Sequence, residues 1–464
     1  MARTFDQHID SNSLKQSAVT SDHDRRKIAI VGTGISGLSA AWALHKTCDI
    51  TLYEANDRIG GHTNTVKVKS TDGVVPVDTG FIVYNEPNYR NLTALFNLLG
   101  VASNETEMHF SVSARDRDIE YASSGLSGMF ADRRKIASPK FLGMIKDIFR
   151  FYSQAKTMTA SADEHSLGEY LHINNYGKTF IEDHILPMAA AIWSCPVSTI
   201  LQFPATSFAR FFVNHGLVEF GTPFMWRSVD GGSDQYIEPL TQGFAGRIKL
   251  NTAISKVYRT SAGVILQTVN AEEKHFDDVI LACHAPQSFE ILADASEEES
   301  RILSTFKTQP NRAVLHRDPT FMPRRRRAWA SWNYLSEQAG TDELSVTYWM
   351  NELQELRIQT DYFVTLNPSF EPKTNSIIAE FDYAHPVFDT AATKAQRDIW
   401  EIQGKNNVWY AGAWLGYGFH EDGLQAGLAV AEAMSEWRRP WNFDFSRERL
   451  NRPLPTPEQK AVAA

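Results

Sequence analysis

Cysteine is scarce in this sequence of 464 residues, which has three: Cys48, Cys195 and Cys283. They lie far apart and form no C-x-x-C pair, which argues against a disulfide framework and a zinc site. No other metal site is predicted. Because free thiols are typical of a reducing compartment, we expect a cytoplasmic protein.

Long apolar runs and excess positive charge are also absent. No stretch of about 18 uninterrupted apolar residues occurs, and residues 1–26 are polar without the apolar core of a signal peptide. We therefore expect a soluble protein, or a peripheral one on the inner face of the cell membrane, with residues 1–26 as a disordered arm. With 46 Lys+Arg against 55 Asp+Glu, the net charge of -9 gives no general reason to expect nucleic acid.

The sequence does contain a glycine-rich turn between a strand pattern and a helix pattern. After the apolar run 27–31, Gly32, Gly34 and Gly37 follow in G-x-G-x-x-G register, with Ser36 in the same turn. The first glycine allows a tight turn, the second lets backbone approach a pyrophosphate, and the third lets a helix pack closely on a strand. This is the pattern of a dinucleotide site.

A carboxylate and a second glycine pair follow this unit. The predicted strand 49–53 ends in Glu54, roughly 20 residues beyond the glycines, where a carboxylate accepts hydrogen bonds from ribose hydroxyls. NAD and FAD would both fit so far. The continuation Arg58, Gly60, Gly61, His62, Thr63 favours FAD, because a longer dinucleotide needs a further backbone contact.

At this point the sequence resembles the flavin-containing amine oxidase and phytoene desaturase superfamily, whose pattern of acid, Arg, apolar residue and Gly-Gly matches EANDRIGG. The family often has Arg or Lys after the glycine pair, where this chain has His62. The resemblance implies an α/β fold: a Rossmann-type FAD-binding domain (glutathione-reductase-like, amine oxidase type) interleaved with an α+β substrate domain. The expected boundaries are 27–85, 225–295 and 400–437 for the FAD domain, 86–224 for a helical part and 296–399 for a sheet part of the substrate domain, and 438–464 for a C-terminal strap and tail.

The second informative stretch is NNVWYAGAWLGYGFHEDGLQAGLAVAEAM, residues 406–434. It predicts a short strand ending at Gly412, an aromatic loop, and a helix beginning at Gly423. The resemblance assigns Gly412 to phosphate contact, and the backbones of His420 and Leu424 to the flavin carbonyl edge, since a helix N-terminus stabilises negative charge.

The resemblance extends to two further segments. It places Gly80 and Phe81 beside the flavin ring, although a plain strand and turn would explain the same residues. It also implies that the backbone of Ile254 contacts the adenine.

The loop before this helix also bears on the chemistry. No cysteine follows Cys283, so we expect FAD to be bound noncovalently. Where amine oxidases of the superfamily place a Tyr, this chain has Phe419. With Trp414 and Tyr417 it is expected to form an aromatic wall suited to an apolar group near flavin N5.

His420 is the side chain of this loop expected to titrate near neutrality. It is therefore a candidate acid or base, or else a hydrogen-bonded loop histidine. The following acids, Glu421 and Asp422, could simply cap the helix.

Three other segments allow alternative interpretations. The basic segment 131–156 predicts a helix that lies either on an anionic membrane or on the core with a solvated basic side. Arg324 to Arg327 could form a solvated loop or bind phosphate headgroups or an acyl carboxylate. Residues 179–214 are dense in apolar groups, most of them expected in the core and some lining an apolar tunnel.

Most of the chain resembles the bacterial FAD-binding amine-oxidase-like proteins often encoded beside cyclopropane-fatty-acid-synthase-like methyltransferases. The matching segments are IWSCPVSTILQFPATSFARFFVNHGL, AWASWNY and AGAWLGYGFHEDGL. The kinship implies desaturation of a methylated fatty acyl chain of a membrane phospholipid, as in routes to furan fatty acids, with a methyltransferase as a possible partner. The alternatives are double-bond isomerisation, amine oxidation, and a non-catalytic flavoprotein that presents lipid to the methyltransferase. Without a second G-x-G-x-x-G unit for NAD(P)H, oxygen or a membrane carrier is the expected electron acceptor.

Overall fold

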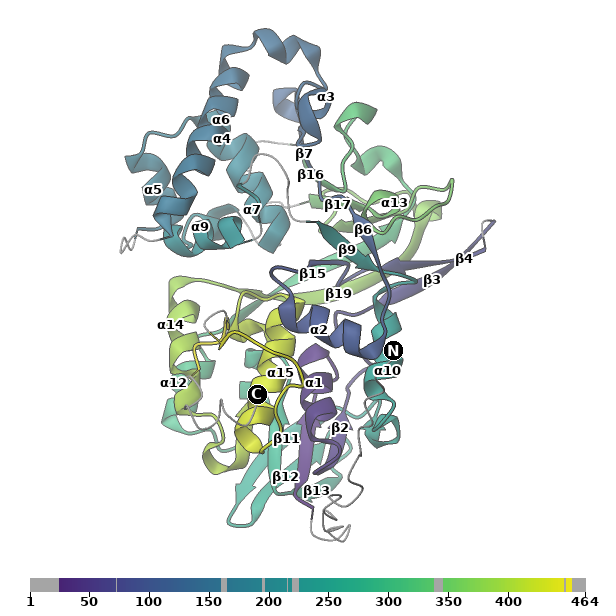
Figure 1. Ribbon diagram of the computed structural model, residues 1–464, viewed down its shortest axis with the longest axis vertical. Coiled ribbons are helices and arrows are strands. Elements are labelled where there is room, and N and C mark those ends of the chain that lie inside the picture. Colours follow the sequence, from purple (N-terminus) through teal and green to yellow (C-terminus); the bar gives the residue numbers. More distant parts are fainter. Residues whose placement is uncertain are drawn as a thin grey trace, which may run out of the picture.

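A five-stranded parallel sheet forms the centre of the lower body in Figure 1. The computed structural model describes residues 25–71, 73–159, 165–193, 197–214, 216–218, 225–337, 345–445 and 448–452, so 1–24 of the predicted arm and 453–464 of the predicted tail lie outside it. The strands lie in the order β10 (Ile248–Lys249), β2 (Asp49–Tyr53), β1 (Lys27–Val31), β14 (Asp278–Leu281) and β20 (Val408–Tyr410). Their largely apolar, buried runs are typical of a parallel sheet covered on both faces.

Helices and a small antiparallel sheet complete this lower body. The antiparallel sheet contains β11 (Ile254–Thr260), β12 (Gly263–Thr268) and β13 (Glu273–Phe276). The helices are α1 (Ile35–Leu44), α2 (Arg90–Leu99), α10 (Ile237–Thr241), α11 (Ala285–Ile291), α12 (Glu297–Leu303), α14 (Thr390–Asp398) and α15 (His420–Met434). The predicted Rossmann-type fold is confirmed.

Close contact between α1 and α15 joins the first and last parts of this body. A Cβ at Gly427 would lie 2.1 Å from both the carbonyl oxygen of Ser36 and Oγ of Ser39. Ser39 Oγ also donates to the carbonyl oxygen of Leu424 (3.4 Å). Two helices that are distant in sequence therefore lie side by side, as Figure 1 shows.

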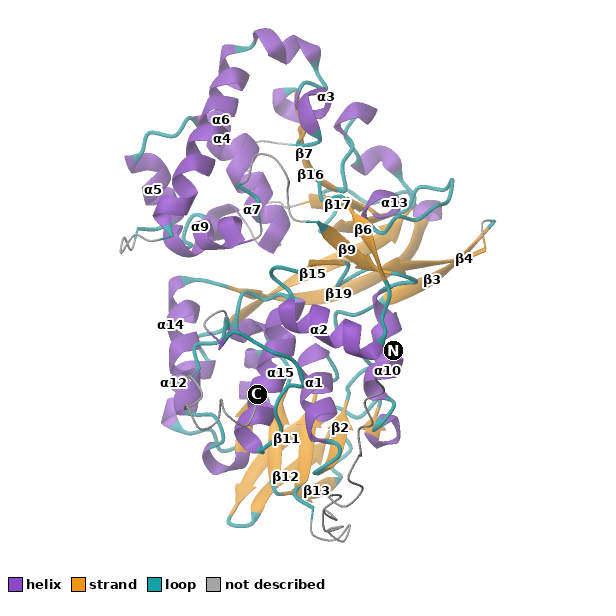
Figure 2. Ribbon diagram, viewed as in Figure 1, coloured by secondary structure: helices purple, strands orange, loops and turns teal. Residues whose placement is uncertain are grey.

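A seven-stranded mixed sheet lies above the first body (Figure 2). Its order is β19 (Ile377–Val387), β15 (Lys307–His316), β18 (Phe363–Leu366), β17 (Ser345–Trp349), β16 (Trp332–Ser336), β7 (Phe110–Ala114) and β8 (Ile119–Ala122). Two small sheets and a helix adjoin it: β3 (Thr65–Ser70) with β4 (Gly73–Asp78), β5 (Val83–Asn85) with β9 (Trp226–Val229) and β6 (Ser103–Thr106), and α13 (Met350–Leu353).

A group of helices forms the upper end of the molecule in Figure 1. It contains α3 (Gly125–Met129), α4 (Pro139–Met158), α5 (Leu167–Ile173), α6 (Lys178–Phe180), α7 (Leu186–Trp193), α8 (Val197–Ile200) and α9 (Ala205–Asn214). The predicted helical part, 86–224, also contains the strands β6, β7 and β8. Strand β7 pairs in parallel with β16, more than 200 residues later.

Four buried charged side chains attach the C-terminal strap to α15. Arg439 donates to both carboxylate oxygens of Glu432 (2.8 and 2.9 Å), and Arg452 pairs with Glu432 (2.9 Å) and Glu448 (2.5 Å). Burial pushes the pKa of Glu432 upward, but the two arginines outweigh burial and lower it below the usual value.

Candidate active site

The first glycine turn follows β1 and opens α1. Gly32 has φ +105°, and a Cβ there would lie 2.7 Å from the carbonyl oxygen of Ala282. A Cβ at Gly37 would lie 2.0 Å from the carbonyl oxygen of Gly32. At Gly34 and Ser36 the helix N-terminus lines a cavity, and no described side chain caps it. This leaves a backbone site suited to phosphate.

We expect the Gly37→Ala variant to lose bound flavin, because its Cβ would overlap main-chain atoms that cannot move without shifting β1. The matched control is Gly143→Ala in α4, where a Cβ meets nothing within 4 Å. That change should stabilise the fold by about 0.5–1 kcal/mol through helix propensity. Flavin absorbance and thermal unfolding measure both effects. A fully yellow Gly37→Ala protein would contradict the proposed role of this contact.

Glu54 lies directly after β2 at the same edge of the sheet. Its Oε2 accepts from the backbone and hydroxyl of Thr33 (3.1 and 2.5 Å), and its Oε1 accepts from the backbone and amide of Asn56 (3.0 and 2.9 Å). The carboxylate is thereby held beside the first glycine turn, where it lines the cavity. This is the place predicted for a ribose contact.

The second glycine pair faces the first turn. A Cβ at Gly61 would lie 3.0 Å from Cα of Gly34, so the two backbones converge. Arg58 donates to the carbonyl oxygen of Thr63 (3.1 Å), which fixes this loop. His62 is half-buried, and the Nε2 atom of its ring is itself buried with no hydrogen-bond partner among the described residues.

The helix of the second motif begins earlier than predicted. It starts at His420 rather than Gly423, because the Asp422 carboxylate accepts from the backbone of Phe419 (2.9 Å) and caps the first turn. Glu421 instead accepts from the backbone N–H groups of Asn91 and Leu92 (3.0 and 2.9 Å) at the start of α2. Both acids therefore act as helix caps.

The expectation that His420 titrates near neutrality is wrong. Its ring stacks on Phe81 (centroids 3.9 Å apart) and its Nε2 lies 2.8 Å from the Tyr236 hydroxyl. That hydroxyl also contacts Thr63 Oγ1 (2.6 Å). Burial lowers the pKa of His420 to about 3, so the ring is neutral at physiological pH.

The remaining predicted residues surround the same space. Gly80 approaches the backbone of His62, where a Cβ would lie 2.1 Å from its carbonyl oxygen. Trp414 donates its indole N–H to the carbonyl oxygen of Cys283 (3.1 Å), packs on Phe306 and lines the cavity. The cavity also reaches Ile254 and Gly412, whereas Leu424 is fully buried in α15.

A cavity of about 2140 Å³ connects these loops to the helical end of the molecule. Its volume is roughly twice the upper end of the 300–1,000 Å³ typical of drug-sized ligands, so it has room for a dinucleotide and a second molecule. The cavity reaches several residues of the predicted tunnel segment: His184, Met188, Ile192, Trp193 and Phe211.

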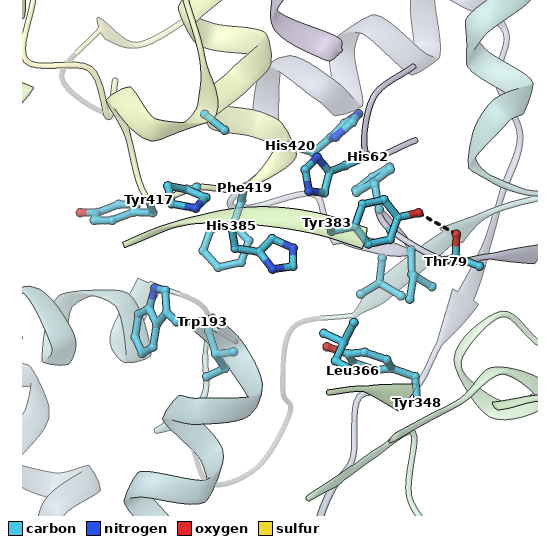
Figure 3. Close-up of a pocket in the computed structure, with 18 of the residues that line it drawn as sticks. His62, Thr79, Trp193, Tyr348, Leu366, Tyr383, His385, Tyr417, Phe419 and His420 are labelled. Carbon is cyan, nitrogen blue, oxygen red and sulfur yellow. Dashed lines mark hydrogen bonds between the residues drawn. The ribbon is translucent and has the colours of Figure 1, made fainter. Parts of the chain in front are cut away.

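Aromatic rings of α7, α9 and the loop before α15 pack on one another in the wall of the cavity. Phe419 stacks on Phe211 of α9 (centroids 5.3 Å, planes 21° apart), and Tyr417 meets Phe211 edge-on at 6.2 Å. Trp193 lies 4.7 Å from Phe211. Figure 3 shows Tyr417, Phe419 and Trp193 on one side, with Tyr348 and Leu366 on another.

A tyrosine and a histidine on β19, which no sequence motif indicated, also belong to the site. Tyr383 stacks on His62 (5.0 Å), His385 lies 5.3 Å from it, and both line the cavity (Figure 3). The Tyr383 hydroxyl contacts Asn64 and Thr79, each at 2.8 Å. The i, i+2 spacing of Tyr383 and His385 in a strand was the available signal.

A chain of amides fixes the tautomer of His385. The backbone N–H of Arg312 donates to Oδ1 of Asn367 (3.0 Å), whose Nδ2 donates to Oδ1 of Asn311 (2.6 Å). Asn311 Nδ2 must then donate to His385 Nδ1 (2.8 Å). The neutral ring therefore carries its proton on Nε2. Burial first, and His284 second, lower the pKa of His385 to about 4.

These features fit FAD. Two open glycine turns converge at an uncapped helix N-terminus, and a carboxylate lies where a ribose would bind. Gly34, Gly61 and Glu54 would hold the nucleotide, and the start of α15 would face the flavin. Fold and site together define a dinucleotide-binding flavoprotein.

The chain belongs to the family of flavin-containing amine oxidoreductases, whose model matches residues 35–314. Its cofactor is FAD. It is 26% identical to the horse (Equus caballus) flavin-containing amine oxidase A over 279 residues, which cover 54% of this chain and 47% of that enzyme. The chain spans about half the length of such curated relatives.

Two solved structures share the fold. Putrescine oxidase bound to putrescine has a TM-score of 0.64 at 16% identity, covering 88% of this chain and 98% of that one. A fatty acid isomerase from P. acnes that produces CLA has a TM-score of 0.60 at 15% identity, covering 89% and 99%.

Proposed function

We propose that the protein is an FAD-dependent oxidoreductase that removes two hydrogens from a fatty acyl chain of a phospholipid, one of them as a hydride. The observation that carries this proposal is the continuity of the cavity, which runs from the glycine turns to apolar side chains of α3 and α4. A hydrocarbon chain needs only shape and dry walls for recognition. The similarity to a fatty acid isomerase supports an acyl substrate.

Bound FAD supplies the hydride acceptor. The protein supplies a neutral, aromatic environment, because burial lowers the pKa of His62, His284, His385 and His420. A carbon that becomes electron-poor as hydride leaves is stabilised by ring faces such as those of Phe211 and Phe419.

A weak base then suffices for the proton on the neighbouring carbon. We assign the role of this base to Nε2 of His62, which has no hydrogen-bond partner among the described residues. This nitrogen carries a lone pair when the ring's own proton is on Nδ1. Two carbon–hydrogen bonds would break and a carbon–carbon double bond would form, with the proton passing to His62 and bound FAD supplying the acceptor for the hydride. Oxygen or a membrane electron carrier would supply the final oxidant.

The test mixes the flavoprotein anaerobically with a phospholipid carrying methyl-branched acyl chains, followed by mass analysis of the lipid. We expect the flavin absorbance to bleach and the product to be two hydrogens lighter. An isobaric product without net bleaching would instead indicate an isomerase. Bleaching by amines alone would indicate an amine oxidase, the activity named for its relatives. Unchanged lipid and flavin would leave a non-catalytic role beside a methyltransferase.

A pair of α9 variants makes the test specific to the cavity. Phe211→Asp places a carboxylate in the apolar cavity, which costs several kcal/mol, and should slow bleaching at least about 100-fold. The control is Asn214→Asp, which adds the same charge at an exposed position of the same helix. Equal rates in the two variants would place the acyl chain elsewhere.

A further inference from the structure

The mouth of the cavity opens among exposed apolar side chains on α3 and α4. Leu126 is 80% exposed, Phe149 52% and Leu142 44%, and all three also line the cavity. Ile136, between the two helices, is 54% exposed. A cavity whose lining continues onto exposed apolar side chains can admit a ligand from an apolar phase without passing it through water.

Helix α4 has two apolar stripes that explain this opening. One stripe contains Phe141, Met144, Ile148 and Phe151, which are buried in the helical core. One side of the basic helix therefore packs on the core, as one of the two alternatives predicted, while its contact with a membrane stays a prediction. The second stripe, Leu142, Ile145, Phe149 and Tyr152, is displaced by one residue and lines the cavity.

The basic segment 131–156 and the run Arg324 to Arg327 meet at this mouth. Arg325 pairs with Glu120 (2.6 Å) and Asp132 (3.4 Å), and Arg134 pairs with the same Asp132 (2.7 Å). The short helix Arg326–Ala328 also contacts α3. Segments about 190 residues apart in the sequence therefore share one end of the molecule.

Several cations at this end have no local counterion. Glu120 and Asp132 are already paired, whereas no carboxylate of the described chain lies within ion-pair distance of the five exposed side chains Arg133, Lys140, Lys146, Arg324 and Arg327. Because the whole chain carries a net charge of -9, this concentration of positive charge is local. It complements an anionic surface.

We propose that the α3–α4 mouth docks on an anionic lipid bilayer, with Leu126, Ile136 and Phe149 entering the headgroup region and the surrounding cations contacting lipid phosphates. Among the described residues, no helix combines the length and apolarity needed to cross a membrane, so docking is peripheral. This inference deepens the proposed function, because a docked mouth would receive the acyl chain directly from the bilayer. A protein partner on the same face is the competing outcome.

The test is sedimentation of the holoprotein with vesicles of phosphatidylcholine, with and without 30% phosphatidylglycerol by composition. We expect binding to the anionic vesicles alone, weakened by 0.5 M salt. Each lost cation should weaken partitioning about five-fold, so the combined Arg133→Ala, Lys140→Ala and Arg324→Ala variant should lose on the order of 100-fold. Leu126→Asp alone should also weaken binding.

The matched control lies on the β11–β13 sheet, at the far end of Figure 1. It combines Lys256→Ala, Lys274→Ala and Val269→Asp, all at exposed positions, and should bind as the unmodified protein does. No binding of the unmodified protein to anionic vesicles at low salt, or equal loss in the control, would overturn the proposal.

The measurement does not depend on turnover. Vesicle binding without bleaching by lipid would leave the docking surface in place and reject the proposed reaction. Bleaching by detergent-dispersed lipid without vesicle binding would support the proposed reaction and reject the docking surface.

Discussion

Replacing Glu432 by alanine should lower the free energy of unfolding by about 3–5 kcal/mol, because it leaves Arg439 and Arg452 buried with one carboxylate between them. Chemical denaturation monitored by tryptophan fluorescence measures the change. The control is Glu436→Ala, which removes an exposed carboxylate from the turn after the same helix and should cost less than about 0.5 kcal/mol.

The stabilisation by Glu432 should also depend on pH with a defined sign. Its pKa in the folded protein is lowered, so its contribution is present above the unfolded pKa and is lost as pH falls through the folded value. The difference between the original protein and Glu432→Ala should therefore shrink in acid. A difference that grows in acid would contradict the assignment of this carboxylate as the partner of the two arginines.

Replacing Asn311 by aspartate should reverse the tautomer of His385 and raise its pKa by about 1–3 units. The new carboxylate can only accept, so it would accept a hydrogen bond from Nδ1–H of His385 and stabilise the charged ring. In the original protein the pKa is about 4, and the bleaching rate should be flat between about pH 5.5 and 8. The variant should acquire an inflection between about pH 5 and 7.

Two measurements check this expectation. Nitrogen NMR of labelled histidine should show Nε2–H in the original protein and Nδ1–H in the variant, and rates of flavin bleaching against pH should show the new inflection. The control is Asn270→Asp, which adds the same charge at an exposed turn of the β12–β13 hairpin. An unshifted His385 in Asn311→Asp would mean that the amide chain does not set its protonation.

The sequence was informative where the chemistry depends on neighbours in the chain. The glycine turns, Glu54 and the loop 412–422 could be predicted because each places its functional atoms within a few residues of one another. Helix α15 starts three residues earlier than predicted, because the Asp422 side chain accepts a hydrogen bond from the backbone N–H of Phe419. The spacing of residues alone does not predict this cap.

The rest depends on contacts between distant segments. Strand β7 exists because β16 pairs with it, and the tautomer of His385 depends on Asn367 of the turn after β18 reaching Asn311 of β15. The low pKa of His420 follows from burial against Phe81 and Tyr236, the nearer of which lies 184 residues away in the sequence. Patterns among neighbouring residues in the sequence do not predict such burial.

The packing of α15 on α1 has a consequence for biosynthesis. Ser39 and Leu424, which meet across these helices, are separated by 385 residues. At about 5–20 residues per second, a ribosome needs roughly 20–80 s to synthesise that interval. During this time the nascent nucleotide turn is present without the helix that packs on it, so the contact between α1 and α15 forms only after α15 has been translated.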